Sequence, residues 1–212
     1  MSTPARQYRS PRREREALRT RQDILAAAKT LFLSEGYSHV TVADIAAAAG
    51  VALKTVYVSA GSKSEILHVL LTADVENSAA PQTLKAVRAA SNLEEAIRAI
   101  SRGTRNNTEE FADTIELLLA SRSADSAAAS TWEHILGEYR TALHDAAKQL
   151  LQAQHVSADA GLESLADLLW FYFGLGSWRA LTIECQWTYD RAETWLARRA
   201  TEAVRQEWPV RE

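Results

Sequence analysis

The stretch TVADIAAAAGVALKTVYVSAGSKSEIL, residues 41–67, constrains the fold more than any other part of the chain. It contains two short helix-like segments separated by Gly50, and a third helix is expected to begin at Ser62. Helices this short are unstable alone, because their few hydrogen bonds do not offset the cost of nucleation. They must therefore pack against a longer helix, and apolar residues at helical spacing predict one at residues 19–35.

Local signals mark where these helices begin and turn. Thr41-Val-Ala-Asp44 and Ser62-Lys-Ser-Glu65 both have the form of a capping box. Gly50 can adopt the positive φ that a sharp turn requires. The pattern predicts a helix after Thr41, a second at residues 53–58 and a third through residue 77. Packed on the helix at residues 19–35, the two short helices form a helix-turn-helix unit whose second helix can enter a DNA major groove.

The rest of the chain also predicts helices, so we expect an all-α fold. Among 212 residues there are only eight Gly and four Pro, and no convincing strand pattern. Pro81 is expected to interrupt the pattern. Longer helices are predicted at residues 92–107, 108–121, 125–154, 158–184 and 190–207. The single Cys, the lack of a secretory signal and the lack of a long apolar stretch predict a cytoplasmic protein with no membrane partner.

Charge is distributed unevenly along the chain. Residues 1–65 hold ten Lys or Arg against six Asp or Glu, whereas residues 66–212 hold 14 against 21. A basic N-terminal third on an acidic body indicates that one end meets a polyanion, although a merely solvated basic tail has the same composition. Residues 1–18, rich in Arg and containing two Pro, are expected to form a flexible basic arm.

Side chains on the second short helix suit contact with DNA. Lys54 can donate to guanine or phosphate, and the Tyr57 ring can lie along the sugar–phosphate wall unless it is a core aromatic. Lys63 lies in the first turn of a helix, where a cation opposes the helix dipole and a bound phosphate would reverse that penalty. The predicted DNA-binding residues are Thr41, Ala52, Leu53, Lys54, Thr55, Tyr57, Val58, Ser59 and Lys63.

Residues 20–71 resemble the tetracycline-repressor (TetR) family of transcriptional regulators. The resemblance rests on Ile24, Ala28, Phe32, Gly36, Tyr37, Thr41, Val42, Ile45, Ala46, Ala49-Gly50-Val51, Thr55-Val56-Tyr57, Gly61-Ser62-Lys63 and Ile66-Leu67. It implies a homodimer whose N-terminal domains, residues 19–65, bind a palindromic operator. It also implies that residues 66–212 bind a small-molecule effector and dimerise, and that the protein is a repressor released by that effector.

Three positions depart from the family pattern. Ala52 stands where a small hydroxyl residue is common, so the recognition helix lacks its usual cap. Lys54 stands where Gly is frequent, which adds a possible DNA contact. Ala60 replaces a nearly invariant aromatic, which leaves the pose of Val58 and Ser59 open.

The C-terminal two-thirds offer a dimer interface and an effector pocket. The helix at residues 158–184 is apolar nearly all round, which predicts burial against both its own core and a partner subunit, or burial inside a monomeric bundle. The predicted interface residues are Leu169, Phe173, Leu196, Ala200 and Ala203. The predicted pocket residues are Phe111, Ile115, Leu118, Trp132, Ile135, Tyr139, Trp170 and Trp178, although aromatics at helical spacing are more often core.

Two other classes of protein fit the sequence less well. The five His are scattered without metal-ligand spacing, and no phosphate-binding glycine loop is present, so we expect no enzyme, no cofactor and no metal. A sequence-independent DNA architectural protein would also carry basic segments, but a protruding readout helix and a large aromatic-rich second domain favour a regulator.

Overall fold

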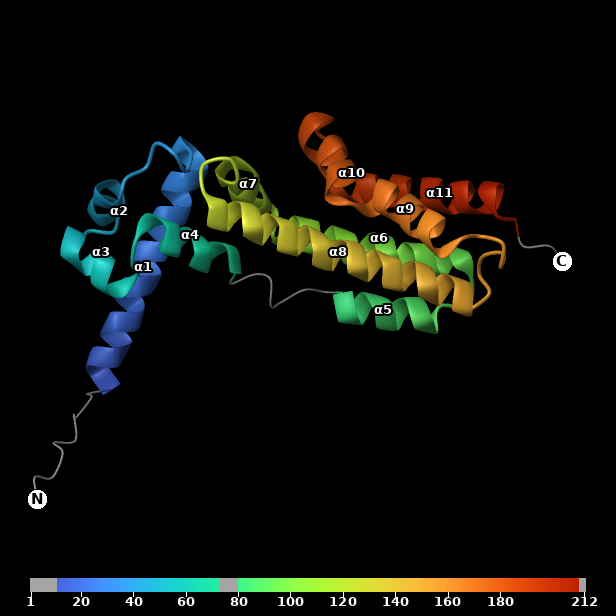
Figure 1. The fold of residues 1–212 in the computed structure, drawn as a ribbon, viewed down its shortest axis with the longest axis horizontal. Helices are drawn as coiled ribbons and strands as arrows, with labels where there is room; N and C mark the ends of the chain where they lie inside the picture. Colours follow the sequence, from blue (N-terminus) through green and yellow to red (C-terminus); the bar gives the residue numbers. More distant parts are fainter. Residues whose placement is uncertain (1–10, 73–79, 210–212) are drawn as a thin grey trace, which may run out of the picture. The chain divides into compact units, whose positions relative to one another are not determined.

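The computed structural model describes residues 11–72 and 80–209, and every regular element in them is helical (Figure 1), which confirms the predicted all-α class. The chain divides into two compact units. Unit 1 comprises Met1–Ala73 and Glu116–Trp132, and unit 2 comprises Asp74–Ile115 and Glu133–Glu212. The N-terminal unit therefore includes a segment from the middle of the chain that the division at residue 65 does not anticipate.

The first helix, α1 (Pro11–Glu35), begins earlier than predicted. The expected flexible arm is helical from Pro11 onward, and its first ten residues lie outside the described part. Proline suits a first helical position, because the N–H that it lacks would have no intrahelical partner there. The helix ends where predicted, at Gly36, whose φ of +85° is a left-handed conformation and whose N–H donates to the Phe32 carbonyl at 3.1 Å.

Three short helices complete the N-terminal fold: α2 (Val42–Ala48), α3 (Leu53–Ser59) and α4 (Lys63–Thr72). Both predicted capping boxes are present. At the first, the Thr41 N–H donates to Asp44 at 2.8 Å and the Asp44 N–H donates to the Thr41 hydroxyl at 3.2 Å. Gly50 has φ +66°, and the chain bends by 100° between α2 and α3, as a helix-turn-helix requires.

Unit 1 has its own apolar core, built on the helical face that the sequence predicts for α1. Helix α1 packs against α2, α3 and α4, so the two short helices bury their inner faces. The fully or nearly fully buried side chains are Ile24, Ala28, Phe32, Tyr37, Val40, Ile45, Ala46, Val56, Ile66, Leu67 and Leu71.

The remaining helices belong wholly or partly to unit 2 (Figure 1). They are α5 (Ala80–Ala89), α6 (Leu93–Glu110), α7 (Ala112–Ser121), α8 (Ser126–Gln152), α9 (Leu162–Phe173), α10 (Leu175–Arg179) and α11 (Tyr189–Glu207), with a π-helical stretch at Ala180–Glu184. Helices α7 and α8 contain residues of both units. No single helix among the described residues is long and apolar enough to cross a membrane; only α2 and α3, counted together across their bend, reach that length and composition.

Two predictions about this region were wrong. Pro81 does not interrupt a helix but lies in the first turn of α5, where its missing N–H would have no intrahelical partner. The helix expected at residues 158–184 breaks at Gly174, whose ψ of 161° is extended. A Cβ at Gly174 would lie 2.5 Å from the Trp170 carbonyl oxygen, so the break needs a glycine.

The core of unit 2 forms between α5, α6, α8, α9 and α11. Leu143, Ala147 and Leu150 of α8 share one apolar cluster with Ile97 and Ile100 of α6. Helix α11 contributes Ala192, Leu196, Ala200 and Val204 to the same cluster, and Trp178 is completely buried within it. Each helix therefore buries one stripe and leaves the opposite face for solvent or a partner.

Candidate nucleic-acid interface

Helix α3 has one buried face and one strongly exposed face. Val56 is completely buried and anchors the helix to the core. On the other side, Lys54 is exposed, Tyr57 is 53% exposed and Val58 is 78% exposed. Tyr57 is therefore not a core aromatic, which removes one of the two interpretations of this ring. A short helix that exposes an amine, a phenol and an isopropyl group together can contact both base edges and phosphates.

Two of the three departures from the family pattern, Ala52 and Ala60, lie at the two ends of α3. Ala52 supplies no side-chain cap, and the first turn is held only by backbone bonds such as Thr55 N–H to Ala52 O at 2.8 Å. At the other end, Ala60 is buried and its N–H donates to the Val56 carbonyl at 2.8 Å. The small side chain thus fits under the helix without an aromatic ring. Of the two residues before it, Val58 is exposed and Ser59 is half-buried.

The N-terminus of α2 is an exposed, capped helix start. The Thr41 hydroxyl lies 2.6 Å from an Asp44 carboxylate oxygen, and hydrogen bonds from the Thr41 side chain and backbone lower the pKa of Asp44. Asp44 therefore stays ionised, and its carboxylate accepts hydrogen bonds from Thr41 within the capping box. A phosphate approaching this end would meet Thr41 and the free amides of the first turn beside a carboxylate.

Lys63 is not a freely extended lysine. Its ammonium lies 4.2 Å from the centroid of the Tyr37 ring, in a cation–π contact. Partial burial lowers the pKa of Lys63, while the charge of Asp125 opposes that change. Lys63 is half-buried, at the first position of α4, and the aromatic platform holds its charge in one place.

Sequence reasoning missed a polar cluster beneath Lys63. The Tyr37 hydroxyl and the Ser64 hydroxyl each donate to the same Asp125 oxygen at 2.7 Å. The other oxygen of Asp125 accepts from the amides of Ala127 and Ala128 at 2.9 and 3.1 Å, which caps α8. An aspartate before a helix is a recognisable N-cap signal. No local pattern reveals its partners 61 and 88 residues away.

The predicted effector-pocket residues do not all lie in one unit. Leu118 and Trp132 belong to unit 1, whereas Phe111, Ile115, Ile135, Tyr139, Trp170 and Trp178 belong to unit 2. Within unit 2, Tyr139 and Trp170 form an edge-to-face pair at 5.8 Å, and the Tyr139 hydroxyl donates to the Phe173 carbonyl at 2.6 Å. Trp178 Nε1 donates to the Thr104 hydroxyl at 3.3 Å.

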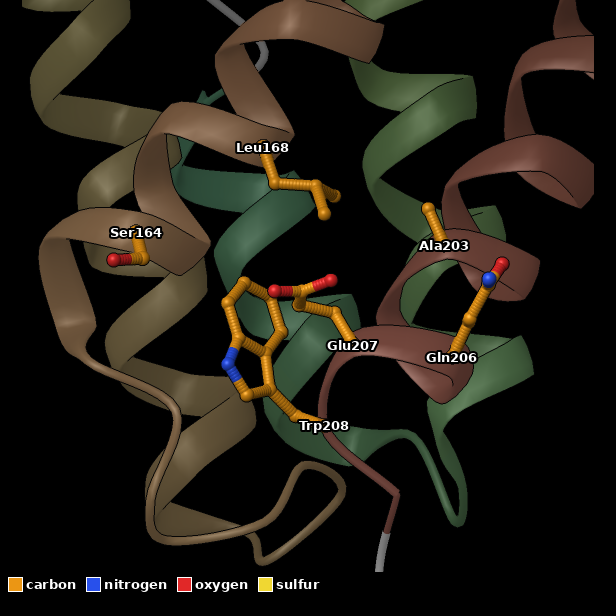
Figure 2. A pocket seen from close by; sticks show the side chains of 6 residues that line it. All are labelled: Ser164, Leu168, Ala203, Gln206, Glu207 and Trp208. Carbon is orange, nitrogen blue, oxygen red and sulfur yellow. The ribbon is translucent and has the colours of Figure 1, made fainter.

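The predicted dimer residues are mostly buried inside the protomer. Leu169, Phe173, Leu196 and Ala200 have at most 1% exposure, so they have almost no surface for a partner. Ala203 is half-buried and lines a surface pocket of about 430 Å³. Figure 2 shows this pocket between α9, which supplies Ser164 and Leu168, and the end of α11, which supplies Ala203, Gln206 and Glu207 beside Trp208.

These features define a class of protein: an all-helical chain with a helix-turn-helix unit that presents an exposed recognition helix, joined to a larger helical unit. A family model described as "Bacterial regulatory proteins, tetR family" matches residues 24–70, which include α2, α3 and most of α4. Residues 24–70 of the chain therefore match this family of bacterial regulatory proteins. No curated protein sequence matches the chain significantly.

Solved structures share the fold over nearly the whole chain. A TetR-family regulator, PfmR, from Thermus thermophilus superposes with a TM-score of 0.62 at 19% identity, covering 86% of this chain and 94% of that one. FadR from Bacillus subtilis, in complex with stearoyl-CoA, gives 0.63 at 16%, covering 86% and 96%. The fatty acid degradation regulator FadR from Bacillus halodurans gives 0.62 at 14%, covering 94% and 99%. At these identities the likeness concerns the fold.

Proposed function

We propose that the protein is a homodimeric repressor that binds a palindromic operator and leaves it when a small molecule binds unit 2. The observation that carries this proposal is the exposed face of α3. Lys54, Tyr57 and Val58 project from a helix whose opposite side is anchored in the core by Val56. This arrangement suits insertion into a major groove, with Lys54 toward base edges and Tyr57 toward the backbone.

The phosphate contacts come from both sides of α3. Thr41 lies at the exposed start of α2, and Lys63 lies at the start of α4. Each helix start has amides without intrahelical partners that favour an anion. Together they would hold the DNA backbone on either side of the recognition helix, while Lys54, Thr55, Val58 and Ser59 face the groove.

The dimer forms, in this proposal, through the outer faces of α9 and α11. Phe171 is 69% exposed on α9, which is a large apolar group to leave in water. The exposed side of α9 also carries Glu163 and Asp167, and that of α11 carries Arg198 and Arg199. A two-fold axis would set α9 of one protomer against α11 of the other, which pairs acidic with basic residues. The pocket in Figure 2 opens beside these helices and could accept a partner side chain.

The effector site is proposed in unit 2, around the buried hydroxyl groups of α6. Thr104 and Thr108 are nearly fully buried, and Trp178 Nε1 and Tyr139 bond nearby polar groups in the same unit. A ligand entering here would replace these bonds with its own polar group and displace aromatic side chains. Because FadR from Bacillus subtilis has been solved with stearoyl-CoA, long-chain acyl-CoA is the first class of compound to test.

Selection of operator DNA with the purified protein, followed by footprinting, tests the proposed function. We expect one symmetric protected site, with half-sites about one DNA turn or slightly more apart, roughly 34–40 Å. A sequence-independent architectural protein would protect DNA diffusely, and a helical enzyme would protect none.

Titration with stearoyl-CoA, followed by tryptophan fluorescence and by operator binding, then tests the effector class. We expect coupling of about 1–3 kcal/mol if acyl-CoA is the effector.

The dimer is tested by adding a charge to the exposed face of α9. Phe171→Glu should convert the dimer to a monomer at micromolar concentration, since it places an uncompensated carboxylate in the proposed apolar contact. Native mass spectrometry measures the state. Ile183→Glu, at another exposed apolar residue outside α9 and α11, is the control and should stay dimeric. A monomeric unmutated protein would refute the proposed dimer.

A further inference from the structure

The Asp125 carboxylate joins three parts of unit 1 that are far apart in sequence. It receives the Tyr37 hydroxyl from the segment between α1 and α2, and the Ser64 hydroxyl from the first turn of α4, both at 2.7 Å. Its second oxygen caps α8 through the amides of Ala127 and Ala128. All four acceptor directions of one carboxylate are therefore used by defined donors.

The Tyr37 ring has little freedom to move. It is only 6% exposed, packs edge-to-face on Phe32 at 5.1 Å, and is tethered at its far end by the bond to Asp125. Burial, together with the bond to Asp125, raises the pKa of Tyr37, so its hydroxyl stays protonated and donates. Burial alone would raise the pKa of Asp125, but the bonds from Tyr37 and Ser64 lower it, so the acceptor stays charged.

Lys63 rests on this ring. Its ammonium is 4.2 Å from the centroid of the Tyr37 ring, so the position of the ammonium depends on where the ring lies. Ser64, the next residue, is bonded to Asp125 as well, so both the side-chain platform and the backbone of the first turn of α4 depend on the same carboxylate.

We propose that Asp125 is a positioning residue for DNA binding, which acts through Tyr37 and Ser64 to place the Lys63 ammonium for a DNA phosphate. The inference rests on the proposed function, in which Lys63 is a phosphate contact. Asp125 itself touches no DNA in this arrangement. Because the same carboxylate caps α8, the placement of Lys63 depends on where α8 begins.

A double-mutant cycle on DNA affinity tests the proposal. Lys63→Ala should weaken binding about tenfold on operator and random DNA alike, and should reduce the slope of log affinity against log salt by about 0.9 per phosphate, or about 1.8 per dimer. Asp125→Asn and Tyr37→Phe should each weaken binding about three- to tenfold in the unmutated background. In the Lys63→Ala background the same changes should have no effect beyond about twofold, because the group that they position is gone.

Controls distinguish a loss of Lys63 placement from a loss of the folded state and from a simple change in net charge. Tyr37→Phe removes one hydroxyl and keeps the ring, so it tests the positioning role even if Asp125→Asn fails to fold. Thermal unfolding is recorded for every variant. Glu138→Gln, an exposed carboxylate on the same helix α8, makes the same charge change and should leave DNA binding unchanged. Equal losses in both backgrounds, or no effect of Lys63→Ala, would overturn the positioning role. A protein that binds no DNA at all would instead refute the proposed function.

Discussion

Two pairs of identical residues, one in each unit, have opposite environments. On α3, Val56 is completely buried and Val58 is 78% exposed; on α9, Phe173 is completely buried and Phe171 is 69% exposed. Two residues along a helix correspond to about 200° of rotation, so each pair spans the core face and the outer face. The inner member of each pair holds its helix in place, and the outer member is available to a partner.

The surroundings of the exposed residues distinguish the partners that we propose. Val58 stands beside Lys54 and Tyr57, in a net positive third of the chain, which suits a polyanion with a hydrophobic thymine methyl or sugar surface. Phe171 stands beside the half-buried Leu168 and Tyr172, on a helix that also exposes carboxylates. That combination suits a protein surface with an apolar centre and a polar rim. Exposure of an apolar side chain alone therefore does not identify its partner.

The largest expected effect separates the two phenylalanines of α9. Phe173→Ala should lower the free energy of unfolding by about 3–5 kcal/mol, because it leaves a cavity in the core of unit 2. Phe171→Ala should change the unfolding free energy of the monomeric protein by less than about 0.5 kcal/mol. Urea unfolding of both variants, at protein concentrations low enough for the monomer to predominate, measures this. Similar losses for the two would mean that α9 is not oriented as described.

A smaller effect tests whether the outer face of α3 reads bases. Lys54→Ala should cost about 1–3 kcal/mol on the selected operator and much less on random DNA, because a lysine toward guanine contributes sequence discrimination. Fluorescence anisotropy with both DNAs at two salt concentrations measures it. Equal losses on the two DNAs would make Lys54 a phosphate contact, and specificity would then rest on Thr55, Val58, Ser59 and DNA shape.

A further comparison concerns how α2 and α9 begin. Helix α2 has a side-chain cap at Thr41, whereas α9 follows Gly161 and has no side-chain cap. Thr41→Ala should lower the free energy of unfolding by about 0.5–2 kcal/mol, because an amide of the first turn loses its acceptor. Gly161→Ala, which removes no cap, is the control for α9. Thermal unfolding measures both, and an unaffected Thr41→Ala variant would show that packing alone holds α2.

The smallest expected effect is a titration. Bonds from Thr41 lower the pKa of Asp44 below its ordinary value of 3.8. A lowered folded pKa means that the contribution of this cap to stability is complete above the unfolded pKa and is lost as the pH falls through the folded pKa. Carboxyl NMR titration should therefore give an Asp44 midpoint below 3.8, and Thr41→Ala should raise it. A midpoint unchanged by Thr41→Ala would mean that the capping box does not form in solution.

The local features of unit 1 could be predicted directly from the sequence. The two capping boxes, the turn at Gly50 and the inner face of α1 are all encoded within a few residues of where they act, so their hydrogen-bonding and periodic patterns predict them directly. The same local signals predicted α11 and the start of α6. The all-α class and the helix-turn-helix unit followed from them.

Which side of the nearly uniformly apolar helix α9 faces the core depends on packing and could not be predicted from the sequence. Because α9 is apolar nearly all round, periodicity could not choose between Phe171 and Phe173, and the choice depends on how α6, α8 and α11 pack around it. Tertiary structure also brought Asp125 to Tyr37 and Ser64, and placed Glu116–Trp132 with the N-terminal unit. These contacts join residues 61 and 88 positions apart, a range over which neither capping nor helical spacing carries information.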